Sequence, residues 1–158
     1  MNAGKNLPKP EGRAIVDPAK RSMMLAALYI AQEQNGYLTE DAMKQVAKRL
    51  GLPLGEVYST ASFYTLFRAK PVGKFVIQVC EGLSCYLCDG AERVADYVGA
   101  KLGIKPGETT HDGRFTLETV QCLASCGTAP AMRVNDRLYE NLTPAMIDDI
   151  LERLRGEV

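Results

Sequence analysis

The chain has 158 residues, 46% of them hydrophobic and 24% charged, and its 19 basic and 19 acidic residues give a formal net charge of zero. This composition is typical of a globular protein and excludes collagen-like, mucin-like and wholly disordered chains. Without an excess of positive charge, we expect no nucleic-acid partner. The longest uncharged stretch runs over 14 residues from Thr119 to Met132. A membrane-spanning helix needs roughly 20, so we expect no direct membrane insertion.

Charge and periodicity both change near residues 70–73. Residues 1–72 hold ten Lys/Arg and six Asp/Glu, whereas residues 73–158 hold nine and thirteen. The first part has helical spacing throughout, and the second mixes strands with helices. We therefore expect a flexible N-terminal arm over 1–16, a helical bundle over 17–72 and a mixed α/β domain over 73–158. The fold class is α+β.

Capping signals predict three helices in the first part. One begins at Asp17-Pro18 and ends at Gly36, a second runs from Thr39 to Gly51, and a third runs from Pro53 to Phe67. Hydrophobic residues of the first helix recur at helical spacing and indicate core packing; they are Met24, Leu25, Leu28 and Ala31. The third helix is poor in charge and rich in aromatic residues from Val57 to Phe67. Such a face is expected to be covered by the second domain or by another chain.

The second part predicts a small open sheet with helices packed on it. Residues 75–79 and 115–120 have the β-branched and aromatic content of strands. A hairpin with a turn at Asn135-Asp136 follows them. Helices are expected over 89–102 and from Thr143-Pro144 to about Arg155.

All five cysteines lie between Cys80 and Cys126, and the first 20 residues show no apolar block of a secretory signal. An odd count without such a signal argues against a disulfide scaffold and for metal or redox chemistry. A structural zinc site prefers tight C-x2-C pairs on both sides. A dithiol redox site at Cys85 and Cys88 leaves three cysteines unexplained. The single His111 lies in a polar turn, reads as a solvated loop residue and excludes a Rieske centre, which needs two histidines.

Two iron–sulfur arrangements remain open. The plant-type run C-x4-C-x2-C is matched by Cys80, Cys85 and Cys88 and needs one further cysteine. The alternative pairs Cys80 with Cys85 and Cys122 with Cys126, on two loops that each follow a strand. The neighbouring residues favour this alternative: Gly82 and Gly127 offer unusual backbone dihedrals near the thiols. Apolar cover is expected from Leu83, Leu123 and Ala129.

The cysteines follow the spacing C-x4-C, then 36 residues, then C-x3-C, and the strand-like segments 76–79 and 119–121 precede the two pairs. This pattern resembles the thioredoxin-like [2Fe–2S] subunit of respiratory complex I, NADH:quinone oxidoreductase. Further segments similar to that family are 61–64, 70–73, 102–110, 112–117, 121–123 and 129–130. The resemblance extends from about Asp17 to the C-terminus. Two positions depart from the family pattern: Cys88, where the family usually has no cysteine, and Ala124, where it commonly has glycine.

The resemblance implies a thioredoxin-like domain whose [2Fe–2S] cluster is held by Cys80, Cys85, Cys122 and Cys126, with Cys88 as a non-ligand. The Cys88 thiol is expected to be buried or to point at the following helix. The chain would be an electron-transfer subunit of an NADH dehydrogenase (quinone), inactive alone. Its partners would be the flavoprotein subunit, which binds FMN and NADH, and other subunits of the peripheral arm. It would lie in the cytoplasm, on the cytoplasmic side of a bacterial inner membrane. Equivalent subunits of NAD-linked hydrogenases and formate dehydrogenases are the alternative.

Overall fold

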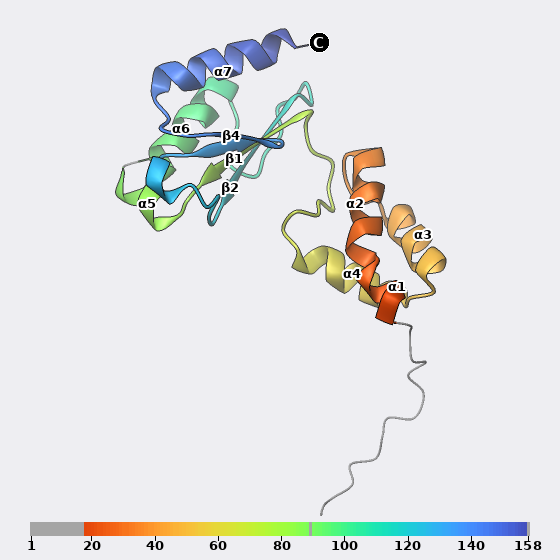
Figure 1. Ribbon diagram of the computed structural model, residues 1–158. Coiled ribbons are helices and arrows are strands. Elements are labelled where there is room, and N and C mark those ends of the chain that lie inside the picture. The colour runs from red at the N-terminus through yellow and green to blue at the C-terminus, as the bar shows by residue number, and fades with distance from the viewer. Residues whose placement is uncertain (1–17, 89, 158) are drawn as a thin grey trace, which may run out of the picture. The chain divides into compact units, whose positions relative to one another are not determined.

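The computed structural model describes residues 18–88 and 90–157, so the expected arm over 1–16 and the expected cap Asp17 lie outside the described residues. The chain divides into two compact units between Lys70 and Pro71. The first unit contains α1 (Pro18–Ser22), α2 (Met24–Asn35), α3 (Glu40–Leu50) and α4 (Leu54–Phe63), coloured red to yellow in Figure 1. Its described residues therefore include helices at all three expected places.

The helices of the first unit are shorter than the sequence predicts. The expected first helix is interrupted at Met23, next to Ser22, whose hydroxyl donates a hydrogen bond to the carbonyl of Ala19 at 2.8 Å. Such local bonds compete with the helical pattern. The third helix ends at Phe63 instead of Phe67, because Tyr64 has extended backbone angles. In its final turns Thr60 also donates its hydroxyl to a helix carbonyl.

The core of the first unit forms between α2, α3 and α4. Gln32 is buried on α2, where its side-chain amide donates to the carbonyl of Leu66 at 3.0 Å and accepts from the backbone N–H of Arg68 at 2.7 Å. This residue fixes the segment that follows α4. Leu25 is exposed, which contradicts its expected place in the core. The buried apolar side chains are Met24, Leu28, Leu38, Met43, Val46, Ala47, Leu50, Leu52 and Val57.

The second unit is a four-stranded sheet in the order β2-β1-β3-β4. β1 (Phe75–Cys80) pairs in parallel with β2 (Phe115–Val120) and antiparallel with β3 (Met132–Val134), which pairs antiparallel with β4 (Arg137–Tyr139). The expected strands and hairpin are confirmed. Between β1 and β2 the chain forms α5 (Leu83–Leu87), which the sequence did not predict, and α6 (Ala91–Leu102).

The helices α6 and α7 (Pro144–Gly156) lie on one side of the sheet in Figure 1. Apolar side chains of β1 and β2 point toward them, as the period of two in a strand requires. Thr143 caps α7 by accepting from the backbone N–H of Met146, as its place before Pro144 predicts. The buried core includes Phe75, Ile77, Val79, Val94, Val98, Phe115, Leu117, Met132, Val134, Ile147, Ile150, Leu151 and Leu154.

Candidate metal centre

The two cysteine pairs begin at neighbouring strand ends. Cys80 is the last residue of β1, and its register partner on the parallel neighbour β2 is Val120, the last residue of that strand. Parallel strands end at the same edge of a sheet, so the loops after β1 and β2 start side by side. One loop continues through α5 to Cys85, and the other contains Cys122 and reaches Cys126 at the start of η1 (Cys126–Thr128).

Gly82 lies beside the first thiol of each loop, those of Cys80 and Cys122. A Cβ atom at Gly82 would lie 3.3 Å from the Sγ of Cys80 and 3.8 Å from the Sγ of Cys122. The backbone N–H of Gly82 also donates to the Sγ of Cys80 at 3.4 Å. A side chain at residue 82 would therefore crowd the small cradle between the two thiols.

Cys85 is buried and lies near Cys80 of its own pair and Cys126 of the other. It is 2% exposed and packs with Cys80, Ala91 and Ala131. Burial raises the pKa of the Cys85 thiol, and its hydrogen bond with the Cys80 thiol and the nearby thiol of Cys126 raise the pKa further. Because α5 also contacts η1, all four cysteines of the two-loop arrangement are brought together.

The two pairs differ in exposure. Cys80 and Cys85 are buried, whereas Cys122 and Cys126 are exposed. Leu123 and Ala129 pack against the buried pair, as expected for apolar cover. The expectation for Leu83 is wrong, because this side chain is 75% exposed on α5. The thiol cluster is therefore covered at the first pair and open to solvent at the second.

Cys88 is not buried, and burial was one of the two alternatives expected for it. It lies at the C-terminal cap of α5 and is exposed, not buried. It lines a pocket together with residues of α6 such as Arg93 and Tyr97 and the α7 residue Ile147. Of the two expected alternatives, burial is wrong because α5 ends at Leu87 and the chain turns before α6 begins. The other, a thiol that points at the following helix, is in keeping with this pocket.

The unusual backbone dihedrals near the thiols belong to Ala124 and not to the glycines. Ala124 has a left-handed conformation with φ 59°, whereas neither Gly82 nor Gly127 has a positive φ. From this conformation the backbone N–H of Ala124 donates to the Sγ of Cys122 at 3.3 Å. The glycine that the family resemblance leads one to expect at position 124 would adopt this positive φ without a steric penalty.

The second loop is also held by a group that the sequence did not indicate. The hydroxyls of Ser125 and Thr128, on either side of Cys126, both donate to the carboxylate of Glu140. These bonds lower the pKa of Glu140. Ser125 lies 15 positions before Glu140 in the chain and Thr128 lies 12 positions before it, so no local sequence pattern connects them.

Sulfur-only donors in two pairs fit a binuclear iron–sulfur cluster, which takes two thiolates on each iron. Among the described residues, no three His, Cys, Asp or Glu side chains surround a point where a single metal ion could sit. His111 is exposed, as expected of a solvated loop residue.

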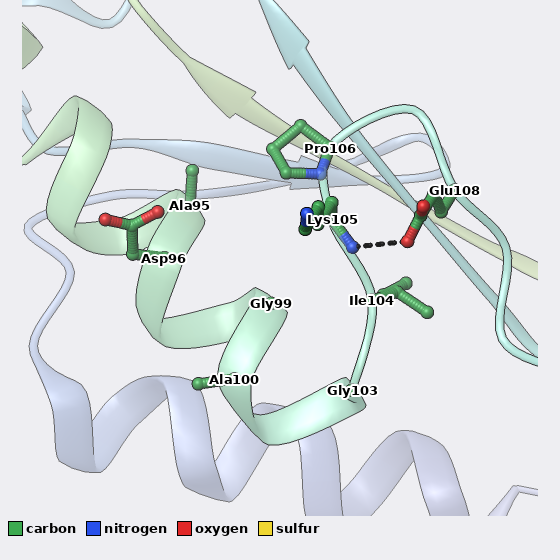
Figure 2. Close-up of a pocket in the computed structure, with 9 residues that line it drawn as sticks. All are labelled: Ala95, Asp96, Gly99, Ala100, Gly103, Ile104, Lys105, Pro106 and Glu108. Carbon is green, nitrogen blue, oxygen red and sulfur yellow. Dashed lines mark hydrogen bonds between the residues drawn. The ribbon is translucent and has the colours of Figure 1, made fainter.

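A pocket separate from the thiol cluster lies at the C-terminal end of α6. Figure 2 shows it between the helix and the loop after Gly103, where the backbone N–H of Lys105 donates to the carboxylate of Glu108 at 2.8 Å. None of its lining residues is a cysteine. Over residues 18–88 and 90–157, no helix is both long and apolar enough to cross a membrane.

The chain is similar in sequence to one protein family and to subunits of NADH-quinone oxidoreductases and of a hydrogenase. The sequence model of the thioredoxin-like [2Fe–2S] ferredoxin family matches residues 14–155. An NADH-quinone oxidoreductase subunit of Rhizobium meliloti is 44% identical over 146 residues, covering 92% of this chain and 86% of that protein. The NADP-reducing hydrogenase subunit HndA of Solidesulfovibrio fructosivorans is 37% identical over 150 residues, covering 92% and 87%.

Solved structures share the fold. A chain of an NAD+-reducing [NiFe]-hydrogenase in the H2-reduced state superposes with a TM-score of 0.76 at 27% identity. The match covers 86% of this chain and 22% of that one.

Proposed function

The chain belongs to the thioredoxin-like [2Fe–2S] ferredoxin family, and on this basis we propose that it is the electron-transfer subunit of an NADH:quinone oxidoreductase, respiratory complex I. The observation that carries the proposal is the meeting of four cysteines from two loops at the common edge of β1 and β2. The alternative host is an NAD(P)-linked hydrogenase, which the hydrogenase relatives support at lower identity.

The proposed ligands are Cys80 and Cys85 from the first loop and Cys122 and Cys126 from the second, with Cys88 outside the set. When bound, a [2Fe–2S] cluster supplies a centre that accepts and returns one electron. The chain's own part is to hold four thiolates at fixed positions. The N–H groups of Gly82 and Ala124 point at two of the sulfurs and favour negative charge on them.

The electron comes from a partner in this proposal. The sequence contains no G-x-G-x-x-G dinucleotide fingerprint or phosphate loop, so NADH and FMN are assigned to a flavoprotein subunit. That partner must approach the open side of the thiol cluster, where Cys122 and Cys126 are exposed. On α5, Leu83 is 75% and Leu87 is 72% exposed, which is the apolar surface that a protein interface covers.

The first unit offers a second apolar surface. Phe63 is 77% exposed, and Tyr58, Tyr64 and Leu66 are exposed around it. We infer that residues 17–72 form a helical bundle that docks on the flavoprotein or a neighbouring subunit, and that residues 73–158 carry the cluster. The assembly would place the chain on the cytoplasmic face of a bacterial inner membrane without inserting it.

The test is reduction of the chain by NADH with and without the flavoprotein subunit. The purified, cluster-loaded chain is expected to keep its visible absorption when NADH is added and to bleach with dithionite. After assembly with the flavoprotein, NADH alone is expected to reduce it. Reduction of the isolated chain by NADH, or no reduction within the complex, contradicts the proposal. The large subunits that purify with the native complex distinguish a quinone oxidoreductase from a hydrogenase.

A further inference from the structure

The turn that presents Cys126 is tied to the segment after β4 by two kinds of bond. The backbone N–H of Asn141 donates to the carbonyl of Thr128 at 2.8 Å, and that of Leu142 donates to the carbonyl of Pro130 at 3.0 Å. Beside them, the carboxylate of Glu140 accepts the hydroxyls of Ser125 and Thr128.

Ser125 and Thr128 are themselves close, with their hydroxyl oxygens 2.6 Å apart. Each hydroxyl has one hydrogen to donate, and a carboxylate oxygen can accept both. The carboxylate thus completes a small ring of three side chains, two of which come from the turn that contains Cys126. Ser125 is buried, whereas Glu140 is exposed, so the ring links the interior of the loop to its surface.

The Glu140 carboxyl group has a lowered pKa because it accepts hydrogen bonds from two hydroxyls, which favours its ionised form. It places a full negative charge beside the residue that precedes Cys126. The potential of an iron–sulfur cluster depends on the net charge around it and on hydrogen bonding to its surroundings.

We propose that Glu140 is a positioning residue for Cys126 and that its charge lowers the reduction potential of the cluster held there. This inference rests on the proposed [2Fe–2S] function and extends it. Reduction adds one electron, and no bond is made or broken. Since the added electron is negative, a fixed carboxylate nearby disfavours the reduced state. The effect should weaken with salt, because the carboxylate is exposed to solvent.

The experiment is a redox titration of the loaded full chain, followed by visible absorption and electron paramagnetic resonance. Glu140→Gln keeps an oxygen that can accept the hydroxyls but removes the charge, and it should shift the potential to a more positive value without loss of cluster. The shift should shrink at high salt. Glu140→Asp retains the charge, so its reduction potential should lie closer to that of the wild type than the potential of Glu140→Gln does.

The matched control is Asp112→Asn. Asp112 is also exposed and accepts a hydroxyl, that of Thr110, but it precedes β2 and so lies at the opposite end of that strand from Cys122. This variant makes the same charge change and should leave the potential unchanged. An equal potential in Glu140→Gln and the wild type overturns the role of the charge.

The positioning role is tested with Glu140→Ala, which removes the acceptor as well as the charge. This variant should lose iron to a chelator faster than Glu140→Gln, and equal rates overturn the positioning role. A chain that never takes up a cluster refutes the proposed function itself. A loaded chain with an unchanged potential refutes only the inference about Glu140.

Discussion

The backbone N–H of Ala124 lies 3.3 Å from the Sγ of Cys122 and reaches it from a left-handed conformation with φ 59°. An alanine in this region carries a steric cost of about 1–2 kcal/mol, which a glycine avoids. The bond to sulfur and the strain at residue 124 therefore have the same origin: a tight turn that the second ligand loop needs.

Replacing Ala124 by glycine should stabilise the chain or leave it unchanged. The relief of steric strain is offset by about 0.5–1 kcal/mol of extra backbone entropy in the unfolded chain. We expect the free energy of unfolding to rise by up to about 1 kcal/mol, measured by denaturant titration without metal. The control is Ala100→Gly at an exposed position in α6, which should destabilise by about 1 kcal/mol. Equal losses in both variants contradict the assignment of strain to residue 124.

Gly82→Ala should impair the thiol cradle. The added Cβ would lie 3.2 Å from the carbonyl oxygen of Gln121 and 3.3 Å from the Sγ of Cys80, so both loops must shift. We expect a loss of about 1–3 kcal/mol in stability and a lower iron content after reconstitution. Gly127→Ala is the matched control, because beyond the neighbouring backbone nothing lies within 4 Å of the Cβ it would add. If both variants load iron equally well, the cradle does not constrain the site.

Serine substitutions at Cys88 and Cys85 separate the two iron–sulfur arrangements. Because Cys88 is exposed, Cys88→Ser should change stability by no more than about 0.5 kcal/mol and leave the cluster spectrum unaltered. Cys85→Ser replaces a soft thiolate by a harder oxygen donor and should lose the cluster or shift its spectrum. Equal damage in both variants would support the plant-type arrangement. Visible absorption and iron content after reconstitution decide between these outcomes.

Acid should remove one contribution to stability at the contact between α6 and α7. Asp148 accepts hydrogen bonds from Lys101 and Tyr97, and these lower the pKa of its carboxyl group, chiefly through Lys101. A lowered pKa in the folded state means that the contribution is present above the unfolded value of about 3.9. It is lost as the pH falls through the folded value.

The variant Asp148→Asn tests this dependence. It should melt at a lower temperature than the wild type at neutral pH, and the difference should close as the pH falls below about 4. Asp149→Asn, at an exposed position on the same helix, is the control, and its melting temperature should match that of the wild type at each pH. A difference for Asp148→Asn that stays constant down to strongly acidic pH contradicts this explanation.

Local signals in the sequence predict much of this fold. Thr39 and Thr143 cap helices where their positions predict, and each side chain accepts a backbone N–H. The strand-like runs before Cys80 and Cys122 pair in parallel, which brings the cysteine loops together. The caps and the strand runs themselves depend on residues within a few positions of each other, so periodicity and spacing reveal them, whereas the parallel pairing joins residues 40 positions apart such as Phe75 and Phe115.

Features set by tertiary contacts were not predictable in the same way. Gln32 fixes the segment after α4 from 34 positions away, and Glu140 reaches Ser125 across 15. The exposure of Cys88 depends on where α5 ends, and that short helix has no strong capping signal. The strain at Ala124 follows from the positive φ of its backbone, which no signal in the sequence reveals.

The most direct test of the proposed function is the cofactor content and redox spectrum of the purified full chain. Two irons and two acid-labile sulfides for each chain are expected, with a red-brown colour that bleaches on reduction by dithionite. The reduced protein should give the paramagnetic resonance signal of a one-electron-reduced [2Fe–2S] cluster. A colourless chain that binds one zinc ion, or a coloured chain that keeps its cluster when Cys85 and Cys126 are both replaced by serine, would contradict the account.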